Sequence, residues 1–422
     1  MNLKKINKCR VCQSKELETI INLGYQYLQG YFKKKNRQDK KKFIEKKYLT
    51  ELVRCNPQKD KKACGLVQLS ISIPSNVLYK KYFYRSGINS TMRDHLKKLS
   101  VQINGFFTNK KRVNILDIGC NDGTLLNFFS KKYNKFGIDP SDSFPKFGIK
   151  NINFINDFFP SIKLKKISKN IKFNIITSIA MFYDLESPKK FVKKINDFLH
   201  DDGIWVFEVS YMPEMLKLNS FDTICHEHLE YYSLNVIKNI LTYNNMKLIK
   251  VELNQSNGGS IRCFVVKNQC NKFQIKENIK EIKNLLDREN KLFLNTKKPY
   301  LKFATNVKKI KKDLQKLIKK LSLQKKKIHV YGASTKGNTI LQYCEIDNKL
   351  IEYAADRNLE KDGLKTLGSN ISIISETKSR KLKPDYYLAL PWHFKKEFIK
   401  REKKFLKEGG KFIFPLPKVE VV

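Results

Sequence analysis

The segment from Ile224 to Ser233, "ICHEHLEYYS", concentrates side chains that can move protons or hold a ligand. His226 and His228 flank Glu227, in a chain that has only six histidines. An imidazole with a pKa near ~6.5 exchanges protons at neutral pH. A metal site is the weakest interpretation, because the spacing differs from the H-E-x-x-H pattern on one helix face. We expect catalysis or substrate binding here, with a purely structural histidine pair as the alternative.

Four of the nine cysteines lie in the first 64 residues, as Cys9-x-x-Cys12 followed by Cys55 and Cys64. Thiolates are preferred zinc ligands, and four of them close a tetrahedral structural site. A Lys-rich loop separates the second pair by more than the usual C-x-x-C spacing, so unrelated thiols are the alternative. We predict one structural Zn²⁺ held by these four cysteines.

A glycine-rich stretch, "NILDIGCNDGTLL", has the features of a strand-to-helix turn that binds a nucleotide-type cofactor. Glycines let the backbone approach a ligand, and a helix N-terminus offers free N–H groups. The spacing is not G-x-G-x-x-G, so a dinucleotide fingerprint fits poorly. Acids end the next two strands, the first placed for ribose hydroxyls and the second for adenine. The predicted cofactor-binding residues are Asp117, Gly119, Asn121, Gly123, Asp139, Asp157 and Phe158.

A second turn of this kind, "YGASTKGN", follows a strand near the C-terminal end. Backbone amides, the hydroxyls of Ser334 and Thr335, and the ammonium of Lys336 form a plausible cradle for a diphosphate. The motif lacks the Walker spacing, so ATP hydrolysis is not expected. We predict substrate binding by these residues and by Asn338, with a glycine turn used only for packing as the alternative.

The elements that carry these turns alternate between strand and helix signals. Apolar runs from "VNILDIGC" to "GIWVFEVS" are separated by helical patterns, and "MKLIKVEL" and "SIRCFVV" close the series as an antiparallel pair. This order predicts an α/β fold with a doubly wound parallel sheet. Residues 271–324 form an amphipathic helical connector, and a second α/β unit begins at "KIHVYG". We expect domains at residues 1–75, 76–270 and 271–422.

The composition restricts the partners. A formal net charge of +44 suggests nucleic acid, but the charge is nearly all Lys and is spread along the whole chain. We favour solvated lysines, with attraction of an anionic substrate as a milder role and no nucleic acid as partner. No apolar run approaches the ~20 residues of a membrane span. The start lacks the apolar core of a secretory signal, so a cytoplasmic location is expected.

Together with the N-terminal cysteines, the motifs "SGINSTMRDHL", "LDIGCNDGTLL", "HEHLEYYS", "NGGSIR", "YGASTKGNTILQY" and "LPWHF" resemble the sugar C-methyltransferase family. The resemblance covers essentially the whole chain. It implies an N-terminal zinc-binding domain, a central class I methyltransferase Rossmann-like sheet that binds S-adenosyl-L-methionine, and a second Rossmann-like domain. Asn121 replaces the middle glycine of motif I. Cys225 and His393 depart from the tyrosine and asparagine that are more usual in the family.

Known members of this family methylate a ring carbon next to a ketone on a nucleotide-linked keto-deoxysugar. The resemblance assigns His228 as the base, with Glu227 beside it. A carbon becomes nucleophilic only after it loses a proton, so the enolate oxygen also needs a stabilising donor. We expect a tyrosine to donate this hydrogen bond, and the candidates are Tyr82, Tyr84, Tyr231 and Tyr232.

His226 is expected to bind substrate beside the base, because residues two apart on a strand share a face and His226 lies two positions before His228. Tyr231 is also expected to bind substrate. The predicted function is therefore an S-adenosylmethionine-dependent C-methyltransferase of a nucleotide-linked deoxysugar. One alternative is a small-molecule O- or N-methyltransferase, which needs a base but no enolate. The other is a zinc-ribbon nucleic-acid-binding module, motivated by the positive charge.

Overall fold

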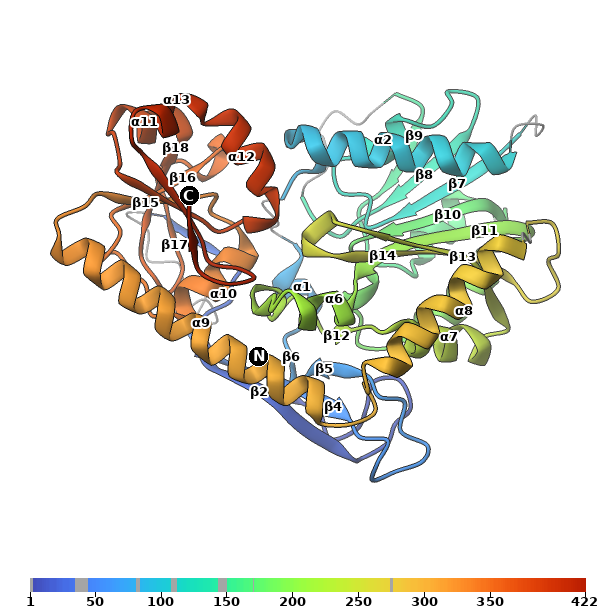
Figure 1. Cartoon of the computed structure of the whole chain (residues 1–422). Coiled ribbons are helices and arrows are strands. Elements are labelled where there is room, and N and C mark those ends of the chain that lie inside the picture. Colours follow the sequence, from blue (N-terminus) through green and yellow to red (C-terminus); the bar gives the residue numbers. More distant parts are fainter. Residues whose placement is uncertain are drawn as a thin grey trace.

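The computed structural model describes residues 3–34, 45–80, 84–107, 112–142, 150–169, 171–273 and 276–422. Three regions surround a common centre: an N-terminal β-sheet, a central α/β sheet and a C-terminal α/β sheet (Figure 1). In the part of the chain that the structure describes, no helix is long and apolar enough to cross a membrane. The predicted α/β class with a small cysteine-bearing domain is confirmed.

The N-terminal sheet has the strand order β12-β5-β4-β2 and is antiparallel throughout. Its strands are β2 (Leu17–Gln26), β4 (Tyr48–Cys55), β5 (Val67–Leu69) and β12 (Glu230–Tyr231), and a small pair is formed by β1 (Lys4–Lys5) and β6 (Ile71–Ser72). Strand β12 belongs to the "HEHLEYYS" segment, so this segment is fixed to the N-terminal sheet although some 160 residues separate them in the chain.

The central sheet has the order β13-β14-β11-β10-β7-β8-β9. Five strands are parallel: β7 (Asn114–Ile118), β8 (Asn134–Ile138), β9 (Ile152–Ile155), β10 (Phe173–Ile179) and β11 (Leu199–Ser210). The predicted antiparallel pair, β13 (Met246–Asn254) and β14 (Ser260–Lys267), closes one edge. The parallel strands read as continuous apolar runs because helices cover both faces. These helices include α2 (Ser90–Asn104), α3 (Thr124–Asn127), α4 (Ile162–Ile167), α5 (Pro188–Phe198) and α7 (Leu234–Tyr243). Helix α6 (Met212–Lys217) packs instead in the core that the N-terminal and C-terminal regions share.

The connector is helical, as predicted, and consists of α8 (Lys276–Lys291) and α9 (Lys298–Leu323). Helix α9 buries a stripe at helical spacing, and its lysines lie on the other faces. The buried residues of this stripe are Tyr300, Phe303, Val307, Ile310, Leu314, Ile318 and Leu321. The stripe packs against β2 and α6, so the connector ties the three regions together.

The C-terminal sheet has the order β21-β20-β19-β15-β16-β18-β17-β3. Its parallel centre is β15 (Ile328–Tyr331), β16 (Tyr353–Asp356), β18 (Ser372–Ser375), β19 (Tyr386–Ala389) and β20 (Lys411–Phe414). Antiparallel strands β17 (Leu364–Thr366), β21 (Glu420–Val421) and β3 (Phe32–Lys34) complete it. Strand β3 comes from the N-terminal region. The C-terminal sheet therefore includes residues that the predicted boundaries at residues 75 and 270 assign to another domain.

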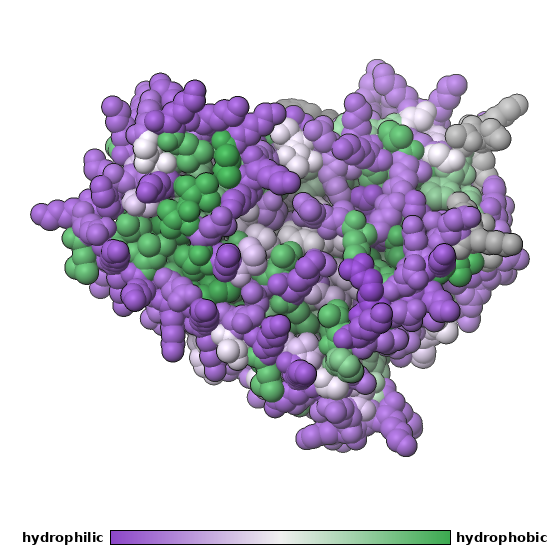
Figure 2. Space-filling view, in the orientation of Figure 1, coloured by the Kyte–Doolittle hydropathy of each residue, from purple (hydrophilic) through white to green (hydrophobic). Residues whose placement is uncertain are grey.

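Hydrophilic side chains cover all three regions on the face shown in Figure 2, and hydrophobic residues gather most over the C-terminal region at the left. This spread matches the even distribution of lysine along the chain. Charge repulsion is lower when lysines are dispersed and solvated than when they are clustered.

Candidate functional site

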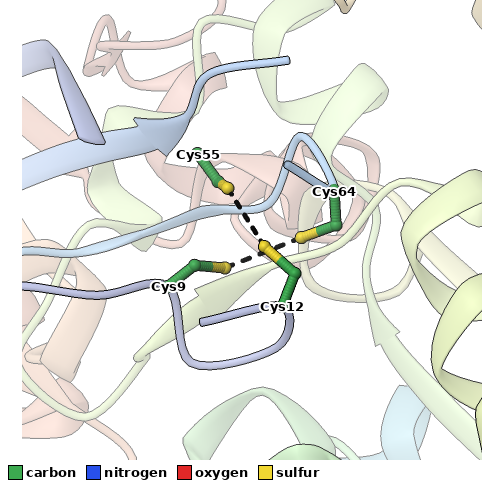
Figure 3. A group of neighbouring side chains, drawn as sticks. All are labelled: Cys9, Cys12, Cys55 and Cys64. Atoms are coloured by element: carbon green, nitrogen blue, oxygen red, sulfur yellow. Dashed lines mark hydrogen bonds between the residues drawn. The ribbon is translucent and has the colours of Figure 1, made fainter. Parts of the chain in front are cut away.

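The four N-terminal cysteines converge as predicted (Figure 3). Their sulfur atoms all lie within 4.8 Å of one another; Cys9 and Cys64 are 3.6 Å apart, and Cys12 and Cys55 are 3.3 Å apart. Four thiolates around Zn²⁺, each about 2.3 Å from the metal, would have comparable separations. The donor set therefore fits a closed structural zinc site, which has no open position for chemistry.

A cavity of about 850 Å³ lies between the carboxyl end of the central sheet and the C-terminal sheet. Residues of all three regions line it, among them Tyr79, His228 and Lys336. Parallel sheets bind ligands at this end, and a cavity of this size holds a cofactor together with part of a second ligand.

The first glycine turn joins β7 to α3 and forms one wall of the cavity. Gly119 has a φ of +73°, and its N–H donates to the Ile138 carbonyl at 2.8 Å. One carboxylate oxygen of Asp139 accepts the Asn121 N–H at 2.8 Å, and the other accepts the Ser141 N–H at 2.8 Å. The turn and the acid of the next strand are thus locked to each other, which holds Asp139 at the cavity edge.

Asn121 explains how the chain manages without the middle glycine of the motif. Its φ is +52°, in the left-handed region that Asn tolerates better than most residues. The side-chain oxygen accepts the Ser86 N–H at 3.0 Å, and the side-chain amide donates to the Tyr84 carbonyl at 3.0 Å. Asn121 therefore fixes the segment that precedes α2 over the first glycine turn, which is called the cofactor turn below.

The other predicted cofactor residues are also placed by the structure. Asp117 lines the cavity and accepts the Thr177 hydroxyl at 2.6 Å, and burial raises its pKa to about 7. Asp157 and Phe158 line the cavity as well, and the Ser161 hydroxyl lowers the pKa of Asp157. Gly123, with a φ of +75°, begins α3 without lining the cavity, so its role is to turn the backbone.

His228 is the histidine of the "HEHLEYYS" segment that reaches the cavity. Its Nδ1–H donates to the Thr223 carbonyl at 2.9 Å, which leaves Nε2 as the basic nitrogen. Nε2 has no hydrogen-bond partner among the residues that the structure describes. Burial and the charge of Lys336 lower the pKa of His228 to about 3, so the ring is neutral at physiological pH.

His226 does not reach the cavity, and we replace its predicted substrate role by a structural one. The ring is fully buried: Nδ1 donates to the Gln29 side chain at 2.7 Å, and Nε2 lies 3.3 Å from the Thr50 hydroxyl. The expectation that both histidines share a face fails because the segment is not extended. The His228 N–H donates to the Cys225 carbonyl at 3.1 Å, which makes a turn.

Glu227 and Tyr231 are also absent from the cavity lining, contrary to the predicted roles. Glu227 is buried, its carboxylate accepts the Gly30 N–H at 2.8 Å, and burial raises its pKa. The Tyr231 hydroxyl donates to the Thr223 carbonyl at 3.0 Å, the same oxygen that holds His228. Both residues therefore stabilise the turn that carries His228.

Of the tyrosines expected to stabilise an oxyanion, Tyr84 lines the cavity, with 45% of its surface exposed. Tyr82 lies outside the described residues. The structure adds two tyrosines that sequence reasoning did not assign to the site. Tyr183 packs edge-on against His228 with ring centroids 4.5 Å apart, and Tyr79 donates to the Glu227 carbonyl at 2.6 Å.

The second glycine turn forms the opposite wall, where Ser334, Thr335 and Lys336 line the cavity at the start of α10 (Thr335–Tyr343). Ser334 caps this helix by accepting the Gly337 N–H at 3.0 Å. Asn338 is buried behind the turn and donates to the Gln29 carbonyl at 2.7 Å. We therefore reassign Asn338 from substrate binding to packing between the N-terminal and C-terminal regions.

Sequence reasoning also missed polar groups around His228. Asp184, Asp222 and His393 line the cavity, and each has a buried side-chain atom without a hydrogen-bond partner among the described residues. Glu208 lines it too and is held by His95 at 2.8 Å and Arg262 at 2.9 Å. These acids stand in ordinary strand or loop contexts, and only the departure of His393 from the family pattern gave a signal.

Three family models match successive parts of the chain: a "zinc binding domain" at residues 9–79, a "Methyltransferase domain" at residues 84–251 and a "C-methyltransferase C-terminal domain" at residues 255–417. A curated relative, the C-methyltransferase NovU of Streptomyces niveus, is 25% identical over 428 residues. That match covers 100% of this chain and 98% of the relative.

Likenesses to solved structures are confined to part of the chain. The plantazolicin methyltransferase BpumL in complex with a desmethyl analogue and S-adenosylhomocysteine is 16% identical, over 43% of this chain and 86% of that chain, with a TM-score of 0.32. The magnesium protoporphyrin IX methyltransferase ChlM of Synechocystis PCC 6803 is 11% identical, over 42% and 79%, with a TM-score of 0.32.

The central sheet, its cofactor turn and the matched methyltransferase domain define an S-adenosylmethionine-dependent methyltransferase. Because the zinc-binding, methyltransferase and C-terminal domains follow one another in the same chain, as the three models and the relative indicate, the enzyme is a C-methyltransferase. An enzyme of this kind makes the alternative of a nucleic-acid-binding module unnecessary.

Proposed function

We propose that this C-methyltransferase acts on a carbon next to a ketone of a nucleotide-linked deoxysugar, through an enolate. One observation carries the proposal: His228, whose ring is neutral, lines the same cavity as the first glycine turn, and its Nε2 has no hydrogen-bond partner among the described residues. Methylation of oxygen or nitrogen can use an existing lone pair. Methylation of carbon requires removal of a carbon-bound proton, and a neutral imidazole held in a fixed orientation can accept that proton.

His228 Nε2 takes the proton, the C–H electron pair forms a carbon–carbon double bond, and the ketone π electrons move to oxygen. When bound, S-adenosylmethionine supplies a sulfonium methyl group that the enolate carbon can attack in line. The contact of His228 Nδ1 with the Thr223 carbonyl keeps the tautomer fixed and favours the imidazolium that forms. Tyr231, on the same carbonyl, helps to hold this geometry.

A nucleotide-linked substrate is supported by the second glycine turn. Parallel α/β sheets bind phosphates where a strand passes into a helix, and α10 begins there at the cavity wall. Ser334 and Thr335 stand at this helix start. A substrate anchored there by its diphosphate would extend its sugar toward His228 and the cofactor turn, which lie across the same cavity.

The test uses deuterium exchange together with methyl transfer. With a thymidine diphosphate keto-deoxyhexose as probe, the wild-type enzyme should exchange the proton next to the ketone in the presence of S-adenosylhomocysteine. His228→Asn should lower exchange and methyl transfer together by about 10²–10⁴-fold, while calorimetry shows unchanged binding of S-adenosylhomocysteine. Methyl transfer to oxygen or nitrogen without exchange would overturn the enolate route.

A further inference from the structure

The surroundings of Lys336 differ from those expected for a lysine that only binds a diphosphate. It is half-buried at the start of α10, and its ammonium donates to the Asn257 carbonyl at 2.8 Å, across the interface between the C-terminal and central regions. No carboxylate lies within salt-bridge distance of it in the described part of the chain. The contact directs the ammonium toward the central region, where the cofactor turn and the base lie.

Two further polar groups line the cavity near this ammonium. Asp222 belongs to η4 (Phe221–Thr223) and accepts the Trp392 indole N–H at 3.0 Å with one oxygen. Its other oxygen is buried without a hydrogen-bond partner among the described residues, as is Nδ1 of His393 in η7 (Trp392–Phe394). Burial lowers the pKa of Lys336, and the neighbouring Asp222 carboxylate opposes this effect. Asp222 therefore favours the charged ammonium.

This group lies close to the base. Asp222 directly precedes Thr223, whose carbonyl holds His228 Nδ1. Burial is the main cause that lowers the pKa of His228 and His393, and the positive charge of Lys336 lowers both pKa values further. A cation beside a general base weakens that base, so its presence is unfavourable for proton removal unless negative charge develops nearby in the transition state.

We propose that Lys336 donates a hydrogen bond to the ketone oxygen of the substrate and stabilises the enolate that His228 generates. This assignment rests on the proposed function and replaces the role of diphosphate ligand expected for Lys336 from the sequence. Asp222 is a positioning residue that keeps the ammonium charged. Ser334 and Thr335 remain at the helix start for the diphosphate.

The step balances without a further reactant. The carbon-bound proton moves to His228 Nε2, and the negative charge that reaches the ketone oxygen is paired with the Lys336 ammonium. When the carbon attacks the sulfonium methyl, the C=O bond re-forms and the S–CH₃ electron pair stays on sulfur. The imidazolium then releases its proton to water. Preorganised donors of this kind contribute about 10²–10³-fold to rate.

The experiment compares Lys336→Met, Lys336→Arg and a control, Lys312→Met, which removes an exposed lysine of α9 and the same charge. Proton exchange is measured with the thymidine diphosphate keto-deoxyhexose and S-adenosylhomocysteine, and the affinity for thymidine diphosphate alone is measured by calorimetry. We expect Lys336→Met to slow exchange about 10²–10³-fold with little change in thymidine diphosphate affinity. Lys336→Arg should fall between it and wild type, and Lys312→Met should match wild type.

Unchanged exchange in Lys336→Met would overturn the assignment, and so would a tenfold loss of thymidine diphosphate affinity with exchange retained, which would make Lys336 a diphosphate ligand. If Lys336→Met does not fold, the decision passes to Lys336→Arg: an exchange rate equal to that of wild type together with weakened thymidine diphosphate binding overturns it. Failure of the proposed function has a different signature, because the wild-type enzyme would then show no exchange at all.

Discussion

The two glycine turns that face the cavity are built alike. Gly119 follows β7 and Gly332 follows β15, with φ values of +73° and +87°. In each turn the glycine N–H donates to a carbonyl at the end of the neighbouring strand, Ile138 or Ala355, at 2.8 Å. The same backbone geometry thus occurs twice, once on each side of the substrate space.

The acids that follow the neighbouring strands show where the turns differ. Asp139 and Asp356 each accept the N–H of the residue two positions later at 2.8 Å. Asp356 is also paired with Lys361 at 3.2 Å, whereas no cation pairs with Asp139 among the residues that the structure describes. We propose that the fold supplies the turn and that the neighbouring charges select the ligand: an acid that stays unpaired among the described residues lies beside the first turn, and an acid paired with Lys361 lies beside the second.

Substitution of one of these two acids at a time should give the largest difference between the turns. Asp139→Ala removes the acceptor that we propose for the cofactor ribose and releases the Asn121 N–H. We therefore expect S-adenosylhomocysteine to bind roughly 10–100-fold more weakly, from about 1.5–3 kcal/mol per charged hydrogen bond. Asp356→Ala, the matched variant, should leave this affinity unchanged. Calorimetric titration of both proteins checks the prediction, and equal losses would contradict the division of roles between the turns.

Replacing Gly119 or Gly332 by alanine compares the two turns by their effect on stability. Alanine at either position would adopt a positive φ, which costs about 1–2 kcal/mol. A Cβ at Gly332 would also lie 2.6 Å from the Pro391 ring, whereas at Gly119 it would meet the Met181 side chain at 3.0 Å. A proline ring adjusts less than a methionine, so Gly332→Ala should destabilise the protein more than Gly119→Ala. Denaturant unfolding of both variants measures this, and the reverse order would contradict it.

The parts of the site that the sequence predicted are local ones. Glycines and acids at strand ends are read within a few residues, and the cysteine spacing restricts zinc ligands in the same way. His228, by contrast, was assigned through a family resemblance. The structure places His226 and Asn338 away from the cavity lining, because both residues contact Gln29, which is about 200 or more residues away in the chain. No periodic pattern reports such a contact.

The remaining surprises have the same origin. Strand β12 pairs with β5, and β3 joins the C-terminal sheet, so the three regions share strands that a linear division of the chain separates. The contact between Lys336 and the Asn257 carbonyl likewise joins two regions. The sequence predicts the central and C-terminal sheets from their own apolar runs. How the sheets meet depends on tertiary packing, and the cavity lined by His228 and Lys336 lies at that junction.

The smallest expected effect concerns pH and the residue two positions before each glycine. This residue is Asp117 in the first turn and the buried Val330 in the second. Burial raises the pKa of Asp117 to about 7, so the carboxyl is neutral below that pH and ionised above it. The cofactor carries an ammonium at its amino-acid end, which favours the ionised acid.

We therefore expect the affinity for S-adenosylhomocysteine to rise several-fold as the pH passes upward through about 7, with one ionisation. Asp117→Asn keeps the size and the hydrogen bond from Thr177 but cannot ionise, so its affinity should stay near the low-pH value of the wild type at every pH. Calorimetry between pH 6 and 8 measures both profiles. If Asp117→Asn kept the rise, the ionisation would belong to another group, and the first turn would no longer differ from the second in holding a titrating acid.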